Sequence, residues 1–122
     1  MGTSEHSEIL TEITALLKHE SEAIMNIPVS ESYIQAVNLI YQKVHTEGGK
    51  VIASGMGKAG QIAENIATTF CSTGTPAVYL HPSEAQHGDL GIIRNNDVLL
   101  VLSNSGKTRE ILELVELTHN LY

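Results

Sequence analysis

The chain has 122 residues, enough for one domain, and its apolar content of 42% is ordinary for a protein with a single hydrophobic core. Seven Lys and Arg residues stand against 14 Asp and Glu residues, and the formal net charge of −7 argues against nucleic-acid binding, which needs a basic face. With Cys71 as the single cysteine, no apolar signal segment and no apolar run near the ~20 residues of a membrane span, we expect a cytoplasmic protein without a membrane partner.

Two amphipathic helices are predicted at the start of the chain. Apolar side chains recur at helical spacing from Ile9 to Ile24, and the pattern stops at Asn26-Ile27-Pro28. A second helix follows Ser30, a favoured N-cap, and Gly48-Gly49 ends it. We expect residues 1–47 to form an N-terminal helical segment that covers a sheet or contacts another copy of the chain. The second apolar stripe consists of Ile34, Val37, Ile40, Tyr41 and Val44.

The first predicted strand, residues 50–54, runs into the glycine-rich stretch GMGKAG. Gly55, Gly57 and Gly60 have the spacing of a dinucleotide-binding fingerprint, placed between a strand and a helix predicted over 62–74. Such a site also needs an acidic residue at the end of the second strand, where His81 stands. A nucleotide role and a tight turn that needs glycines for close packing therefore remain open.

The second predicted strand, residues 76–80, is followed by the loop HPSEAQHGDLG (81–91). His81, His87 and Asp89 match no zinc signature, so we expect no metal site. Ser83 and Gln86 have the spacing of a capping box, which predicts a short helix. A histidine in a loop at the carboxyl end of a strand can still have a functional role.

The third predicted strand, residues 97–103, leads into SNSGKTRE and a helix over 108–121. A Walker A loop would need a glycine where Val101 stands, so the nucleotide-triphosphatase interpretation fails. Ser103, Ser105 and Thr108 put three hydroxyls at a helix N-terminus, which favours a phosphate monoester over an elaborate N-cap. The net acidity does not prevent this, because local N–H and hydroxyl donors can outweigh distant carboxylates.

Strands that alternate with helices predict an α/β fold with a parallel sheet. The third strand lacks apolar-polar alternation, as expected for a strand buried on both faces. The carboxyl ends of parallel strands share one edge, so Lys58, His87 and the three hydroxyls are expected to converge there. Three strands make a thin sheet, and we expect a larger domain cut after the third strand and its helix.

The motifs GMGKAG, HPSEAQHGDLG and SNSGKTREI, in this order, closely resemble the sugar isomerase (SIS) domain of the arabinose-5-phosphate isomerases. The resemblance runs from about Ile40 to the C-terminus. It implies a flavodoxin-like three-layer domain, of which residues 48–122 would be the first half. It also implies interconversion of D-ribulose 5-phosphate and D-arabinose 5-phosphate for the synthesis of Kdo, a sugar of lipopolysaccharide, without a metal or other cofactor.

The resemblance also implies site residues. Lys58, His87 and Glu110 match residues implicated in the family's active site: Lys58 would supply positive charge, His87 would shuttle protons, and Glu110 would act as base or orient Lys58. The family uses a further acidic residue and histidine that would fall beyond Tyr122, so this chain alone is expected to be inactive. The expected substrate-binding residues are Ser54, Gly55, Gly57, Ser103, Asn104, Ser105, Gly106 and Thr108.

Rival functions belong to other classes. A non-catalytic SIS module could bind a phosphosugar or nucleotide-sugar effector, and CMP-Kdo could bind in the same cleft as a feedback ligand. A nicotinamide-dependent oxidoreductase would need the acidic residue that His81 replaces. The resemblance also implies a homodimer or homotetramer, for which the stripe that begins at Ile9 is a candidate contact surface.

Overall fold

The structure is a computed structural model that describes residues 2–121. The segment up to Tyr33 and the segment from Ile34 onward form separate compact units. The first unit is dominated by α1 (Thr3–Met25), in which no side chain is buried. The predicted helix is therefore confirmed, and it begins before the apolar pattern because the Glu5 carboxylate accepts a hydrogen bond from the Gly2 N–H at 2.7 Å. No helix among the described residues is long and apolar enough to cross a membrane.

The second predicted helix is confirmed, with one irregularity. It consists of α2 (Glu31–Ile40) followed by a π-helical stretch, Tyr41–Thr46, in which Val44 is buried. Gly48 then takes a left-handed conformation with φ of 73°, and the Gly49 N–H donates to the Lys43 carbonyl at 2.9 Å. These glycines turn the chain into the first strand.

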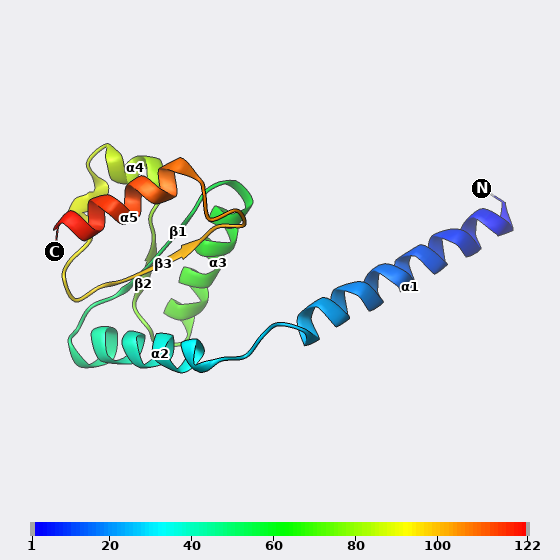
Figure 1. Cartoon of the computed structure of the whole chain (residues 1–122), viewed down its shortest axis with the longest axis horizontal. Helices are drawn as coiled ribbons and strands as arrows, with labels where there is room; N and C mark the ends of the chain where they lie inside the picture. Colours follow the sequence, from blue (N-terminus) through cyan, green and yellow to red (C-terminus); the bar gives the residue numbers. More distant parts are fainter. Residues whose placement is uncertain (1, 122) are drawn as a thin grey trace. The chain divides into compact units, whose positions relative to one another are not determined.

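A three-stranded parallel sheet organises the second unit (Figure 1), which confirms the predicted α/β class. Its strands are β1 (Val51–Gly55), β2 (Ala77–Tyr79) and β3 (Val98–Leu102), in the order β2-β1-β3. Every residue of the central strand β1 is buried, whereas every residue of β3 keeps partial exposure. The expectation of a strand buried on both faces is thus met by β1 and was wrong for β3, which lies at an edge of the described sheet.

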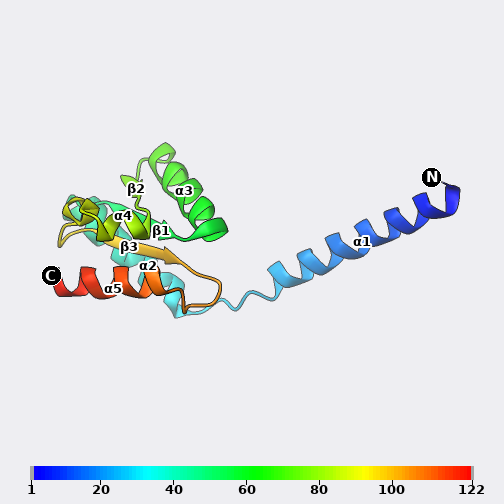
Figure 2. The same cartoon turned by 90° about the horizontal axis from the view of Figure 1, so that it is seen from above.

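Helices cover both faces of the sheet (Figure 2). On one face, α3 (Gly57–Ser72) packs its small Ala63 and Ala67 against Ala53 of β1. On the other face lie α4 (Pro82–Gln86), the 3-10 turn Asp89–Ile92 and α5 (Arg109–Leu121). There Ile52 of β1 joins an apolar cluster with Ala85 and Leu114. Successive residues of β1 therefore serve opposite cores, as the two-residue period of a strand requires.

Helix α3 begins at Gly57, five residues before the predicted start, because glycines let the strand end and the helix start approach closely. A Cβ on Gly60 would lie 2.6 Å from the Gly55 carbonyl oxygen and 2.8 Å from the Tyr79 hydroxyl. The Tyr79 hydroxyl donates to that same carbonyl at 3.0 Å. Gly57 itself has φ of 58°, a conformation that glycine adopts at little cost. Close packing at Gly55 and Gly60 and the positive φ of Gly57 together account for the glycine spacing.

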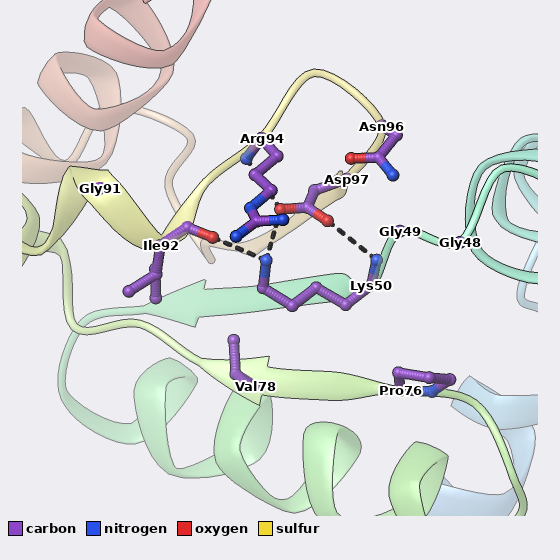
Figure 3. A pocket seen from close by; sticks show the side chains of 10 residues that line it. All are labelled: Gly48, Gly49, Lys50, Pro76, Val78, Gly91, Ile92, Arg94, Asn96 and Asp97. Carbon is purple, nitrogen blue, oxygen red and sulfur yellow. Dashed lines mark hydrogen bonds and ion pairs between the residues drawn. The ribbon is translucent and has the colours of Figure 1, made fainter.

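The amino ends of β1 and β3 are joined by one carboxylate (Figure 3). Asp97 accepts hydrogen bonds from the Lys50 N–H at 2.9 Å, the Lys50 ammonium at 2.6 Å and the Arg94 N–H at 2.8 Å. Burial raises the pKa of the Asp97 carboxyl, but the hydrogen bonds from Lys50 and Arg94 outweigh it and hold the pKa below its ordinary value of 3.8. A cavity of about 660 Å³ opens beside this group, lined also by Pro76 and Val78.

Replacing Gly60 with alanine should destabilise the fold. The added methyl would overlap the Gly55 carbonyl and the Tyr79 hydroxyl, so we expect Gly60→Ala to lower the free energy of unfolding by about 1–3 kcal/mol. Urea unfolding at neutral pH measures this. Gly91→Ala is the matched control because a Cβ there meets nothing within 4 Å, and a Gly60→Ala protein as stable as that control would contradict the packing account.

Removing the Asp97 carboxylate should destabilise the protein in a pH-dependent way. Asp97→Ala leaves Lys50 without its ionic partner, so we expect a loss of about 1.5–3 kcal/mol at pH 7. Because the folded-state pKa is lowered, this contribution is complete above the ordinary pKa and is lost as the pH falls through the folded-state pKa. The unfolding curves of wild type and variant should therefore differ at pH 7 and converge in acid. A constant difference across that range would refute the assignment.

Candidate functional site

A cavity of about 320 Å³ opens where β1 and β3 end. Met56, Lys58 and Ala59 line it from the glycine-rich turn and the start of α3. The loop after β3, residues 103–108, lines the other side. The structure thus brings together five residues that the sequence singled out: Lys58, Ser103, Asn104, Ser105 and Thr108.

Two serines of the loop after β3 (the hydroxyl loop, residues 103–108) hydrogen-bond to the backbone of the same loop. The Ser103 hydroxyl accepts a hydrogen bond from the Gly106 N–H at 2.9 Å, and the Ser105 hydroxyl accepts one from the Lys107 N–H at 3.1 Å. Since each serine oxygen acts as acceptor within the loop, its proton is left to donate to a further group. Gly106 closes the turn with φ of 65°. The loop therefore presents donors, which suit an anion.

Thr108 and Lys58 complete the donor set. Thr108 directly precedes α5, and within residues 2–121 its hydroxyl makes no hydrogen bond. Lys58 is exposed in the first turn of α3, and it has no ion pair with any described residue. The N-termini of α3 and α5 both meet the cavity, and helix N-termini favour negative charge. This corner is thus locally positive in a protein of net charge −7.

Six of the predicted site residues do not line this cavity: His87, Glu110, Ser54, Gly55, Gly57 and Gly106. His87 is exposed and follows the last residue of α4, and Glu110 is half-buried in the first turn of α5. Ser54 is fully buried, and its hydroxyl donates to the Leu80 carbonyl, which ties β1 to the chain after β2. Gly55 and Gly57 shape the turn that carries Lys58 without lining the cavity themselves.

The N-cap of α4 is His81, which corrects the predicted capping box of Ser83 and Gln86. The His81 Nδ1 accepts a hydrogen bond from the Ser83 N–H at 3.2 Å, and Pro82 occupies the first turn. Ser83 is therefore already inside the helix. The sequence signal for this arrangement was the proline, which is favoured at the first helical position and places the cap one residue before it. Among the described residues, no three His, Cys, Asp or Glu side chains are grouped to hold a metal ion.

Comparison with known proteins identifies relatives of this chain. The family model of the SIS domain matches residues 45–121. An arabinose 5-phosphate isomerase KdsD of Yersinia pestis is 46% identical over 99 residues, which cover 81% of this chain and 29% of that protein. An arabinose 5-phosphate isomerase GutQ of Escherichia coli K12 is 43% identical over 98 residues, with coverages of 80% and 29%. The chain therefore spans less than a third of the length of these curated relatives.

Solved structures share the fold. A Bacteroides fragilis protein described as a phosphosugar isomerase involved in capsule formation is 63% identical, with a TM-score of 0.90 over 93% of this chain and 59% of that one. An E. coli CFT073 protein solved in complex with arabinose 5-phosphate is 33% identical, with a TM-score of 0.81 over 98% of this chain and 61% of that one. Because the family model matches more than half of its residues, the chain belongs to the SIS domain family.

Proposed function

We propose that this protein is an aldose–ketose isomerase that interconverts D-ribulose 5-phosphate and D-arabinose 5-phosphate, a step toward Kdo and lipopolysaccharide. The observation that carries the proposal is the cavity in which Lys58, which has no ion pair within residues 2–121, lies with the hydroxyls of Ser103, Ser105 and Thr108. Relatives named arabinose 5-phosphate isomerase, and a structural neighbour solved with that sugar phosphate, support the choice of substrate.

The hydroxyl loop binds the phosphate in this proposal. Ser103 and Ser105 retain protons to donate, and the N-terminus of α5 adds a favourable dipole. Phosphate lies at the end of the sugar remote from the reacting carbons. Its binding energy can therefore orient C1 and C2 without taking part in the chemistry.

The reaction moves a proton between C1 and C2 through an enediol or enediolate. It needs a base for the carbon-bound proton, a group that transfers protons between O1 and O2, and charge to stabilise the oxygens. We assign the charge to Lys58, the oxygen-proton transfer to His87, and to Glu110 either the base or the orientation of Lys58. His87 and Glu110 lie outside the 320 Å³ cavity, which is lined by the residues assigned to phosphate binding.

A second candidate function is a non-catalytic module that binds a phosphosugar or a nucleotide sugar such as CMP-Kdo. The observation that favours it is the same donor-rich cavity, which would bind any phosphate monoester or related anion. Such a module needs neither Lys58 nor His87. Turnover of D-ribulose 5-phosphate by the intact protein would separate the two functions, and calorimetry with CMP-Kdo would test feedback binding.

We further propose a homodimer or homotetramer. Helix α1 exposes an apolar stripe, with Ile9, Ile13 and Leu16 each 42–59% exposed. An amphipathic helix of 23 residues without any buried side chain gains little stability in water from its own turns. Contact with another copy of the chain would bury this stripe, and sedimentation analysis measures the resulting mass.

Two substitutions should divide binding from turnover in the intact protein. Ser105→Ala removes a hydroxyl donor from the phosphate loop, so arabinose 5-phosphate should bind roughly tenfold more weakly by calorimetry, the loss of one hydrogen bond to a charged group. His87→Ala should leave this affinity within about twofold and lower kcat by roughly a hundredfold or more, as expected for loss of a proton-transfer group.

Ser72→Ala serves as the control, because Ser72 lies at the far end of α3 and its hydroxyl donates to the Thr69 carbonyl of the same helix. Wild-type affinity in Ser105→Ala would contradict the phosphate loop. Wild-type turnover in His87→Ala would contradict the proton-transfer role but leave the phosphate loop standing.

A further inference from the structure

We propose that Glu113 is a positioning residue that binds α4 and α5 through one carboxylate. It thereby fixes the segment between α4 and the 3-10 turn (the His87 loop, residues 87–88) relative to the hydroxyl loop. The proposal concerns the proposed isomerase site and rests on that function. Glu113 lies one turn into α5 and does not line the cavity. It acts through Gln86 and Arg109.

Each oxygen of the Glu113 carboxylate has its own partner. The amide of Gln86, the last residue of α4, donates to Oε2 at 2.5 Å. The guanidinium of Arg109, the first residue of α5, donates through Nε to Oε1 at 2.6 Å. The next residue after Gln86 is His87, and the residue before Arg109 is Thr108. The bridge therefore ends one residue from each of the two functional segments.

The other anchors of the His87 loop are mostly apolar contacts on either side of it. Helix α4 has only five residues, of which Pro82 and Ala85 are buried. Ala85 reaches the apolar cluster that contains Leu114 of α5, and Leu80, Leu90 and Ile93 join the same cluster on either side of α4, but apolar contacts of this kind are not directional. After His87 the chain passes through Gly88 with φ of 126°. A directional hydrogen bond at Gln86 supplies the orientation that this short helix lacks.

The charge state of the bridge is suited to neutral pH. The hydrogen bond from Arg109 lowers the pKa of the Glu113 carboxyl, partial burial opposes this, and the hydrogen bond from Gln86 lowers it again, with a net pKa below the ordinary value. The carboxylate is therefore ionised and accepts from both donors at once. Figure 1 shows α4 next to α5 on the same side of the sheet, so the bridge is short and lies within one layer.

A charge-swap cycle in the intact protein tests the bridge. Gln86→Glu puts a second carboxylate against Glu113, and Glu113→Gln removes the charge that Arg109 binds. Each should lower kcat about fivefold to twentyfold while KM for arabinose 5-phosphate stays within about twofold. The double swap Gln86→Glu with Glu113→Gln restores one carboxylate opposite one amide between α4 and α5 but not the ion pair with Arg109, so kcat should recover partway toward wild type, above both single variants.

Glu116→Gln is the matched control, since Glu116 is an exposed carboxylate on the same helix and forms no ion pair with any described residue. It should leave kcat and KM unchanged. The His87 imidazole signals in an NMR spectrum provide the readout that does not depend on activity. They should shift in each single variant, stay in place in Glu116→Gln, and return partway in the double swap.

The outcomes separate the two proposals. A wild-type protein without isomerase activity would sink the proposed function, and the imidazole signals would still decide whether the bridge positions His87. An active wild type whose single variants keep wild-type kcat would overturn the positioning role. If kcat fell equally in the single variants and in the double swap, the positioning role would also be overturned. Such a result would indicate a general packing defect, which exchanging the two residues does not rescue. Gln86→Ala, which only deletes a surface amide, should lower kcat likewise if Gln86→Glu fails to fold.

Discussion

Val51–Gly55 pairs in parallel with β2 on one side and with β3 on the other, so all three strands end at the same edge of the sheet. The turn after β1, the loop after β2 and the hydroxyl loop after β3 must then open on that edge whatever their sequences are. The candidate site follows from this constraint. Lys58 and the hydroxyls of the third loop are about 45 residues apart in sequence, yet they line one cavity because their strands are direct neighbours.

Close contacts and side-chain hydrogen bonds join neighbouring strands at this edge. The Gly55 carbonyl lies where a side chain of Gly60 would be, and the Tyr79 hydroxyl donates to that carbonyl from β2. One residue earlier in β1, the Ser54 hydroxyl donates to the Leu80 carbonyl. Neighbouring strands are thus joined by side chains beyond the regular ladder at the point where the site begins. The hydroxyls that supply this support do not line the 320 Å³ cavity.

Much of this architecture could be predicted from the sequence, because helical and strand periods identify elements and parallel strands fix the common edge. The failures were local. The start of α3 was placed too late because glycines lower helix propensity, while here they serve contacts that no local pattern reveals. The cap of α4 was assigned to Ser83 because serine is a commoner N-cap than histidine. Substrate binding by Ser54 stays a prediction; its hydroxyl donates to the Leu80 carbonyl inside the fold, a partner that only coordinates reveal.

The two edges of the sheet use the same residue type in opposite ways. At the amino edge Lys50 is bound by Asp97 and by the Ile92 carbonyl, so its charge is satisfied within the fold and contributes to stability. At the carboxyl edge Lys58 has no ionic partner among the described residues, although the chain carries twice as many acidic as basic side chains. Placing an unpaired cation beside hydroxyl donors and two helix N-termini brings no gain to the folded protein alone. The arrangement becomes favourable once an anion occupies the cavity. The donors at this site therefore support a phosphorylated ligand, whereas the fold alone does not.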